Sequence, residues 1–215
     1  LMSNPGDIEI IIVTNENHNS LTSVSNFVKE CYPWLKFRML QKNGTSNPIG
    51  AMIRFGLAFS TSKYVVLISP YGDDDISIIN NMLTLMRKGS QLVQVSRYSN
   101  QQDSGTVKVV FRFYQAVYQK LAWLFLGLTS SDFTYGFKMF DRVFVQSVGL
   151  TQNTYAISPE VTIKTLLARG KIDYLPSAVM PSLIGGNFKL YKDGPGYLWL
   201  LVRGLLHRIG LINWF

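Results

Sequence analysis

Residues 49–69 read IGAMIRFGLAFSTSKYVVLIS, and this stretch decides the fold class. From Gly50 onward its apolar residues recur at helical spacing, whereas residues 63–69 form a short run that is almost wholly apolar. A strand with few polar positions is typical of a parallel sheet that is covered on both faces. The stretch therefore predicts a helix followed by a buried strand, which is the repeating unit of an α/β fold.

The same alternation continues on both sides of this stretch. Further strands are predicted at 8–13, 36–40, 91–96, 134–140 and 172–176. Helices are predicted near 21–31, 76–88 and 158–169, with a long amphipathic helix after the loop 98–107 and an apolar C-terminal segment. In a parallel sheet, ligands bind outside the carboxyl ends of the strands. The loops 14–20, 69–75, 97–107 and 129–136 are therefore where a site is expected.

Composition fits one α/β domain and leaves the partner open. Of the 215 residues, 47% are hydrophobic and 16% are charged, which is too apolar for a disordered chain. The 21 Lys and Arg against 13 Asp and Glu give a net charge of +8. Such a charge favours nucleic acid, anionic lipid headgroups or phosphorylated substrates, and composition does not choose among them.

Residue counts and missing motifs exclude several kinds of site. A single cysteine, Cys31, rules out an internal disulfide and a cysteine-rich zinc site. His18 and His207 lie too far apart in sequence to suggest a metal pair. No G-x-G-x-x-G follows a strand, and neither a P-loop nor a G-x-S-x-G motif is present. Dehydrogenase, P-loop NTPase and serine hydrolase functions are therefore poorly supported.

Seven fragments of the chain occur in a recognisable order. They are IEIIIVTNEN (8–17), YPWLKFRML (32–40), IGAMIRFGLAFSTSKYVVLI (49–68), SRY (96–98), FRFYQAVYQKLAWLFLGLTSSDFTYGF (111–137), PEVTIKTLLARGKIDYLP (159–176) and GGNFKL (185–190). Together they resemble family 2 glycosyltransferases of the polyprenyl-phosphate type, the group that contains dolichol-phosphate mannose synthases. The resemblance implies an α/β, Rossmann-like nucleotide-diphospho-sugar transferase fold, with a mainly parallel sheet flanked by helices and a C-terminal amphipathic segment. It covers roughly residues 8–206.

Three departures from the family pattern stand out. The family's earlier strand, with its Pro-Thr-Tyr-Asn-Glu turn, has no counterpart before Ile8, so the chain is expected to start one βα unit late. The DDGS turn corresponds to residues 14–17, which read TNEN and lose the aspartate placed against the base. The DxD-type turn corresponds to residues 69–71, which read SPY and lack both carboxylates.

The last departure bears on metal binding. A nucleotide-sugar diphosphate needs charge neutralisation when it leaves, usually by Mg²⁺ or Mn²⁺ held by oxygen ligands. Ser69 and Tyr71 are poor ligands for such a cation, but Asp73 and Asp75 lie immediately downstream and could form a shifted site. The alternative is that Asp74 or Asp75 caps the helix that starts near Ile76, and the two interpretations are compatible.

The resemblance also implies other site residues. Thr14, Asn15, Ser69 and Tyr71 would contact the donor, and Arg97, Arg112, Asp132, Glu160 and Lys189 would serve catalysis. Arg97, Arg112 and Lys189 would face phosphates, whereas Asp132 and Glu160 would lie near the acceptor. Each has a plain alternative: a surface role for Arg97 and Arg112, and a helix-capping or ion-pairing role for Asp132 and Glu160. Asn15 is equally interpreted as a turn residue.

The C-terminal segment suits a membrane surface. Tyr197, Trp199, Trp214 and several leucines offer apolar area, while Arg203 and Arg208 can meet anionic headgroups. The alternative is a helix packed on the domain or in an oligomer interface. No charge-free apolar run reaches the roughly 18 residues that span a bilayer. The polar residues 3–7 predict no signal peptide. We therefore expect a peripheral protein on the cytoplasmic face of a membrane.

The resemblance implies a glycosyltransferase domain at 1–193, followed by an amphipathic segment at 194–215. The activity that it implies is inverting hexose transfer from a nucleotide-diphosphate sugar to a polyprenyl phosphate, with Mg²⁺ or Mn²⁺ as cofactor. The alternative is a degenerate glycosyltransferase fold that binds a lipid, nucleotide or protein partner without turnover. A fragment of a longer or split enzyme is a third hypothesis. No nucleic-acid motif is found, and a homo-oligomer or a partner subunit is left open.

Overall fold

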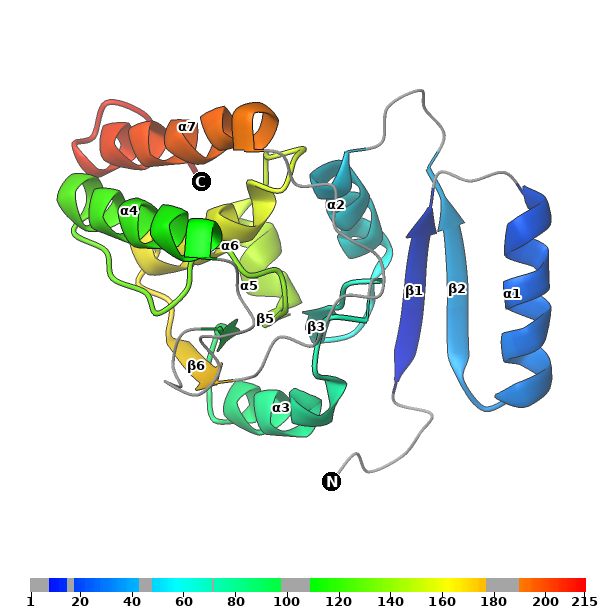
Figure 1. Cartoon of the computed structure of the whole chain (residues 1–215). Helices are drawn as coiled ribbons and strands as arrows, with labels where there is room; N and C mark the ends of the chain where they lie inside the picture. Colours follow the sequence, from blue (N-terminus) through cyan, green and yellow to red (C-terminus); the bar gives the residue numbers. More distant parts are fainter. Residues whose placement is uncertain (1–7, 15–17, 43–47, 71, 98–108, 177–189) are drawn as a thin grey trace. The chain divides into compact units, whose positions relative to one another are not determined.

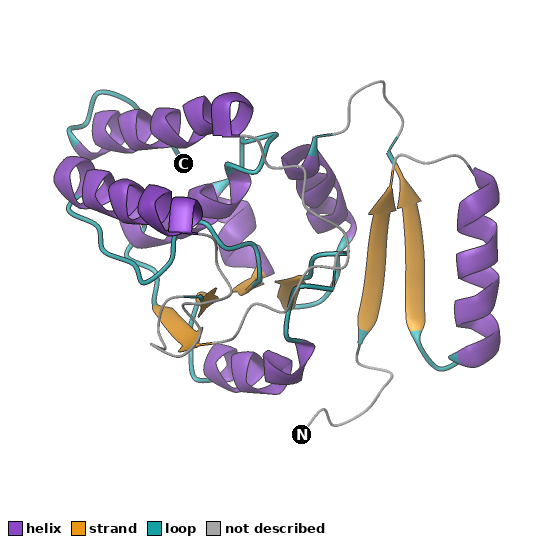
Figure 2. Ribbon diagram, in the orientation of Figure 1, coloured by secondary structure: helices purple, strands orange, loops and turns teal. Residues whose placement is uncertain are grey.

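The computed structural model describes residues 8–14, 18–42, 48–70, 72–97, 109–176 and 190–215, and it is a mixed α/β structure (Figures 1 and 2). The chain divides into two compact units, Leu1–Ser62 and Lys63–Phe215, which are described separately. The predicted alternation of strands and helices is confirmed in both units.

The first unit is built on a two-stranded parallel sheet. Strand β1 (Glu9–Thr14) pairs with β2 (Lys36–Gln41), and helix α1 (His18–Cys31) connects them. Helix α2 (Ile49–Phe59) packs against β1. Gly56 makes this approach feasible, because a Cβ at that position would come within 2.9 Å of a methyl group of Val13.

The second unit contains a four-stranded sheet in the order β3-β5-β4-β6. Its strands are β3 (Tyr64–Leu67), β4 (Leu92–Ser96), β5 (Lys138–Asp141) and β6 (Ile172–Pro176). β4 and β6 are parallel, whereas β5 runs antiparallel to both of its neighbours. The expected fold class, sheets flanked by helices, is confirmed, and within this sheet β5 departs from the parallel pattern because it enters from the opposite end.

Among its described residues, the second unit also contains five α-helices. They are α3 (Ile79–Arg87), α4 (Val109–Leu126), α5 (Arg142–Val148), α6 (Ile157–Leu167) and α7 (Leu190–Arg208), with a 3₁₀ turn, η2 (Ile76–Ile78), leading into α3. The sequence did not predict α5, which follows β5 directly. Asp141 ends the strand and caps the helix, since its side chain accepts a hydrogen bond from the Phe144 amide.

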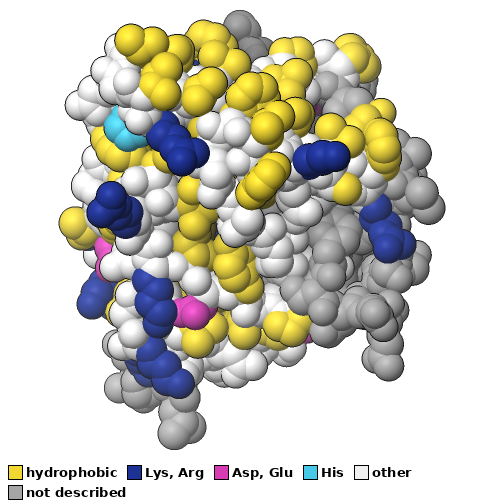
Figure 3. Space-filling view, turned by 90° about the vertical axis from the view of Figure 1, so that its left-hand side faces the viewer, with side chains coloured by type: hydrophobic (Ala, Val, Ile, Leu, Met, Phe, Trp, Pro, Cys, Tyr) yellow, Lys and Arg dark blue, Asp and Glu magenta, His cyan; other side chains and the backbone are white. Residues whose placement is uncertain are grey.

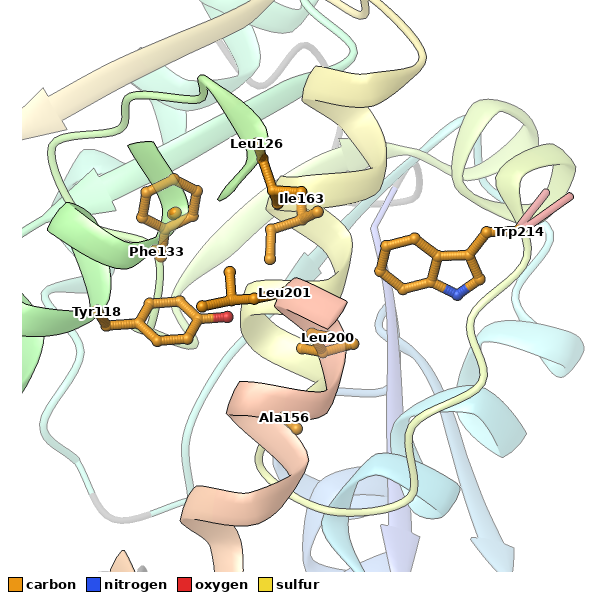
Figure 4. Packing of buried hydrophobic residues seen from close by; sticks show 9 residues of the cluster. Tyr118, Leu126, Phe133, Ala156, Ile163, Leu200, Leu201 and Trp214 are labelled. Atoms are coloured by element: carbon orange, nitrogen blue, oxygen red, sulfur yellow. The ribbon is translucent and has the colours of Figure 1, made fainter. Parts of the chain in front are cut away.

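Two buried clusters hold the second unit together. One lies between α3 and the sheet and includes Met82, Met86, Val93, Val95, Tyr135, Phe137 and Met139. The other joins α4, α6 and α7, and Figure 4 shows its side chains converging between these helices. Its buried members are Tyr118, Ala122, Leu126, Phe133, Ala156, Ile163, Leu200, Leu201 and Trp214.

The C-terminal segment is therefore part of the fold. The predicted boundary between residues 193 and 194 falls inside α7, which packs against α4 and α6. Trp214 is only 3% exposed, so the expectation that it reaches a membrane interface is wrong. Within the described ranges, no helix combines the length and the apolarity needed to cross a bilayer.

Candidate functional site

Three loops of the second unit meet at one edge of the sheet. Lys138, the first residue of β5, lies opposite Leu67, the last residue of β3. Lys138 also lies opposite Gln94, near the end of β4. The residues that follow β3, those that follow β4 and those that precede β5 are therefore neighbours. This edge is formed by the carboxyl ends of β3 and β4, where an α/β sheet binds its ligands.

Arg97 and Asp132 form the central ion pair of this edge. Arg97 Nε donates to Asp132 Oδ2 at 2.7 Å, and Arg97 Nη2 donates to Asp132 Oδ1 at 3.0 Å. The Asp132 side chain is fully buried, while the Arg97 side chain stays 18% exposed. Asp132 also accepts from the amides of Thr134 and Tyr135. Such a bidentate pair fixes the plane of the guanidinium group.

Helix α4 holds the loop that carries Asp132. Thr134 Oγ1 donates to Gln115 Oε1 at 2.8 Å and accepts from Arg97 Nη2 at 2.7 Å. One turn further along α4, Gln119 Nε2 donates to the carbonyls of Ser130 and Ser131, both at 2.9 Å. The loop geometry is therefore set by side chains of the long helix and not by the sheet alone.

Tyr135 links this loop to the turn after β3. Its ring lies 4.8 Å from the Arg97 guanidinium carbon, and its hydroxyl donates to Asp74 Oδ1 at 2.8 Å. The other oxygen of Asp74 accepts from the Ser69 amide at 2.6 Å. Burial raises the pKa of the Asp74 carboxyl, and burial together with Asp74 raises the pKa of the Tyr135 phenol.

The three aspartates of the 73–75 run have different surroundings. Asp75 caps the helical turn, because its Oδ1 accepts from the Ser77 amide at 3.0 Å and from the Ser77 hydroxyl at 2.6 Å. The predicted cap is thus confirmed for Asp75. Both oxygens of Asp74 are hydrogen-bonded. Asp73 differs, since its Oδ1 is buried and has no hydrogen-bond partner among the described residues.

Asp73 is therefore the residue that fits a divalent cation best. A buried carboxylate oxygen without a donor is the kind of ligand that Mg²⁺ or Mn²⁺ prefers. Among the described residues, no three His, Cys, Asp or Glu side chains are grouped to hold a metal ion. A cation at this edge would consequently need further oxygen ligands from a bound diphosphate.

Lys138 is a buried lysine that interacts electrostatically with the ion pair. Its Nζ donates to the carbonyl of Phe133 at 3.2 Å, to the carbonyl of Ser158 and to Thr162 Oγ1 at 2.7 Å. Burial lowers the pKa of the amine to about 7, against a partial opposing effect of Asp132. Lys138 thereby joins the Asp132 loop to the start of α6.

Glu160 serves a different loop from the one that carries Asp132. It is fully buried and accepts hydrogen bonds from the amides of Thr151 and Gln152 and from the Thr151 hydroxyl. It also lies 3.8 Å from Lys164 Nζ. These contacts match the ion-pairing role that the sequence offered as the alternative for Glu160. Its proposed role near an acceptor stays a prediction.

The remaining predicted residues are distributed as follows. Arg112 lies on the exposed face of α4. Ser69 follows β3, and its amide holds Asp74. Thr14 ends β1 in the first unit. Asn15, Tyr71 and Lys189 lie outside the described residues.

Three residues of this network were not predicted from the sequence, namely Tyr135, Gln115 and Lys138. Asp74 was predicted only as a helix cap. Tyr135 carried a usable signal, because it lies in the fragment 111–137 of the resemblance, three residues after Asp132. A lysine inside an apolar strand, such as Lys138, is a second signal that a buried polar network is present. Gln115 carried none, since a glutamine on a long helix is ordinarily solvated.

Comparison with known proteins supports the fold. No protein-family model matches the chain, and no curated protein matches its sequence significantly. Glucosyl-3-phosphoglycerate synthase from Mycobacterium tuberculosis, solved with Mn²⁺, UDP and phosphoglyceric acid, superposes with a TM-score of 0.60 at 16% identity. The match covers 95% of this chain and 69% of that one.

A second solved structure gives the same result. Mannosyl-3-phosphoglycerate synthase from Rubrobacter xylanophilus superposes with a TM-score of 0.66 at 15% identity, covering 96% of this chain and 66% of that one. The chain thus spans about two thirds of the length of these proteins. At such identities the likeness concerns the backbone. The chain has the Rossmann-like α/β fold of nucleotide-diphospho-sugar glycosyltransferases.

Proposed function

We propose that the chain is a glycosyltransferase that moves a hexose from a nucleotide-diphosphate sugar to a polyprenyl phosphate at a membrane surface. The observation that carries the proposal is the buried Asp132 carboxylate, which orients Arg97 at the ligand-binding edge of the sheet. A fixed guanidinium at the same edge of the sheet as Asp73, whose Oδ1 is buried and has no donor among the described residues, suits an anionic ligand that arrives with a cation. The fold is one that binds such donors.

The chemistry requires little of the protein beyond position and charge. An oxygen of the phosphate monoester attacks the anomeric carbon, and the bond from that carbon to the diphosphate breaks. The nucleoside diphosphate leaves with the bonding electrons, so negative charge grows on its oxygens. The phosphate monoester is already anionic near neutral pH and needs no general base. Arg97 would stabilise the leaving charge, and its fixed plane avoids reorganisation during the step.

A divalent cation, when bound, would neutralise the diphosphate as a Lewis acid. Asp73 is the described side chain best placed to hold it, because Asp74 and Asp75 are engaged in hydrogen bonds within the turn. Asp75 would then keep the turn in place and serve the metal only through its other oxygen. Arg112 and Lys189 stay candidates for contacts to the acceptor phosphate.

The lipid acceptor is supported by the exposed side chains of α4 and α7. These helices contact each other, and each exposes bulky apolar side chains away from the buried cluster between α4, α6 and α7. Those on α4 are Phe113, Tyr114, Val117, Trp123, Leu124 and Phe125, and those on α7 are Leu198, Trp199 and Val202. We call this set the α4–α7 face. Figure 3, which views that end of the unit, shows hydrophobic side chains gathered in its upper part with Lys and Arg among them.

The charges of the α4–α7 face complement anionic lipid. Helix α4 contains Arg112 and Lys120 but no acidic residue. On α7 the acidic residue is Asp193, which is 5% exposed, while Lys192 and Arg208 are exposed. Aromatic side chains among basic ones are characteristic of surfaces that lie in the headgroup region. The occupant that suits this face is therefore a bilayer containing anionic lipid.

The test combines donor binding with product analysis. Calorimetry with UDP-sugars and GDP-sugars, with and without Mn²⁺, should detect metal-dependent binding of at least one donor. The full chain should then transfer radiolabelled hexose to a polyprenyl phosphate in detergent, and Arg97→Ala should lower this rate by about 100-fold. Lys88→Ala, on an exposed lysine at the end of α3, is the matched control and should change neither measurement.

A binding protein without turnover is the second candidate. It is favoured by residues 69–71, which lack the two carboxylates of the resembled family, and by the hydrogen bonds that occupy Asp74. Donor binding without hexose transfer to any polyprenyl phosphate would favour this second function. Absence of donor binding under all conditions would refute the glycosyltransferase proposal.

A further inference from the structure

We propose that Tyr135 and Asp74 form a positioning pair, which holds the turn after β3 so that Asp73 faces the donor's diphosphate and its cation. This inference rests on the proposed function and identifies how the site is assembled. Neither residue would touch the substrate. Asp73 would be the contacting group, and the pair would act through it.

The hydroxyl of Tyr135 reaches the turn that follows β3. This hydroxyl lies 2.8 Å from Asp74 Oδ1 and 3.3 Å from the carbonyl oxygen of Asp73, so it contacts two consecutive residues of the turn. Asp74 continues the link through its second oxygen, which accepts from the Ser69 amide at 2.6 Å. The side chain of Asp74 therefore connects Tyr135 to the residue where the turn leaves the sheet.

The link between Tyr135 and Asp74 leaves one carboxylate oxygen of Asp73 available to a ligand. Asp74 is 8% exposed and is held at both oxygens, and Asp75 caps the following helical turn. Asp73, between the Gly72 bend and these two anchored residues, keeps a buried Oδ1 without a donor. Gly72 has a φ of 71°, a conformation that bulkier residues avoid, so the turn is shaped at that point. A buried oxygen left without a partner is costly unless a ligand supplies one.

Tyr135 also connects the Arg97–Asp132 pair to the 73–75 run. The ring of Tyr135 lies under the Arg97 guanidinium at 4.8 Å, and the Tyr135 amide donates to Asp132 at 3.2 Å. One residue thus contacts the Arg97–Asp132 pair with its backbone and ring, and the 73–75 run with its hydroxyl. The distance between the cationic group and Asp73 is consequently fixed through a single side chain.

The length of the Tyr135 side chain matches the place of the acidic run. Residues 69–71 read SPY and carry no carboxylate, so the acidic side chains of this turn are those of the 73–75 run. A side chain as short as serine at position 135 would not reach Asp74, whereas the tyrosine hydroxyl lies 2.8 Å from it. The long side chain and the acidic run therefore belong to one arrangement.

The experiment begins without any ligand. Tyr135→Phe removes the hydroxyl and keeps the ring over Arg97, and the Ser69 amide should then exchange with deuterium at least tenfold faster in the full chain. Tyr64→Phe is the matched control, because Tyr64 packs in the same cluster and its hydroxyl donates instead to the Met86 carbonyl. Equal Ser69 exchange in the two variants would overturn the inference.

The second measurement is Mn²⁺-dependent binding of UDP and GDP by calorimetry. Tyr135→Phe and Asp74→Asn should each raise the Kd for the nucleotide with Mn²⁺ at least tenfold, with little effect on metal-free binding. A purely structural role would weaken both kinds of binding alike or lower the melting temperature. Asp73→Asn should abolish the effect of Mn²⁺.

Failure of this inference and failure of the proposed function give different results. If the wild-type chain binds and Tyr135→Phe binds equally well with Mn²⁺, the inference is wrong and the proposed function stands. If the wild-type chain binds neither nucleotide under any condition, the proposed function fails, and the role assigned to Asp73 fails with it.

Discussion

Asp132 is a fully buried carboxylate that accepts hydrogen bonds from three nitrogens of Arg97, its amide included, from the amide and hydroxyl of Thr134, and from the amide of Tyr135. Asp132→Ala would remove the anion and leave a partly buried guanidinium without its counter-charge. We expect the free energy of unfolding to fall by about 3–5 kcal/mol, as for other buried pairs that lose one partner. Urea denaturation measures this loss.

The control for Asp132→Ala is Lys171→Ala. Lys171 is paired with Asp173 and its side chain is 53% exposed, so its removal should cost under about 1 kcal/mol. Equal losses in the two variants would mean that burial of Asp132 does not decide its contribution.

Lys138 gives the molecule a pH dependence of defined sign. Its amine has a pKa of about 7 in the folded chain and an ordinary value of 10.5. Between these values the unfolded chain binds more protons than the folded chain, so the contribution of Lys138 to stability rises with pH from about 7 to about 10.5. The total change is on the order of a few kcal/mol.

Lys138→Met should remove this rise. Unfolding by urea at pH 7, 8, 9 and 10 gives the stability of both proteins, and their difference should change steadily across this window. Other groups, including Lys164 with a pKa lowered to about 8, are present in both proteins and cancel. A difference that stays constant from pH 7 to 10 would show that Lys138 keeps its proton throughout.

At the scale of single residues, the sequence predicted Arg97 and Asp132 as site residues, and the structure brings these two together. The sequence offered ion pairing as an alternative role for Asp132, and it did not indicate that this pair orients Arg97. The Tyr135–Asp74 contact was not predictable, because it joins residues 61 positions apart and depends on the reach of one side chain.

Among the elements, the C-terminal segment departs most from expectation. Helix α7 ends at Arg208, and Gly210, with a φ of 78°, turns the chain so that Trp214 is buried. Lys164 on α6 then donates to the carbonyls of Val148, Gly149 and Trp214. The segment 209–215 is thereby fastened to α6, which helical periodicity alone could not indicate.

Trp214→Ala tests this fastening. Removing a buried indole from the cluster between α4, α6 and α7 should lower the free energy of unfolding by about 3–5 kcal/mol. Trp199 offers a matched control on α7, because it is 53% exposed and its replacement by alanine should cost less than about 1 kcal/mol. Both values follow from urea denaturation, and similar losses would contradict the burial of Trp214.

The strands illustrate what periodicity can and cannot determine. All six predicted strands are present, because short apolar runs between turn residues are a strong local signal. The direction of β5 was not predictable from residues 134–140, since local pattern carries no information on strand orientation. That direction matters for the site, because it brings the Asp132 loop to the carboxyl ends of β3 and β4.

For the whole molecule, the resemblance carried by the seven ordered fragments implied the α/β nucleotide-diphospho-sugar transferase fold, and the solved structures confirm this fold at 15–16% identity. The net charge of +8 could not identify a partner by itself. The structure adds that both helices of the α4–α7 face expose basic and aromatic side chains together. Part of the positive charge of the sequence is therefore located on these two helices.

This location leads to a prediction for the intact chain. It should sediment with vesicles that contain anionic lipid and much less with neutral vesicles, and its binding should weaken severalfold between 0.05 and 0.5 M NaCl, since salt screens exposed charges. Trp123→Ala and Trp199→Ala should weaken binding at every salt concentration through lost apolar contact. Trp34→Ala is the matched control, because Trp34 is also 53% exposed but lies in the first unit. Equal binding to neutral vesicles, or an equal effect of Trp34→Ala, would contradict lipid binding by the α4–α7 face. A dimer in sedimentation velocity that Trp199→Ala dissociates would also contradict it, because the face would then be an interface between two copies of the chain.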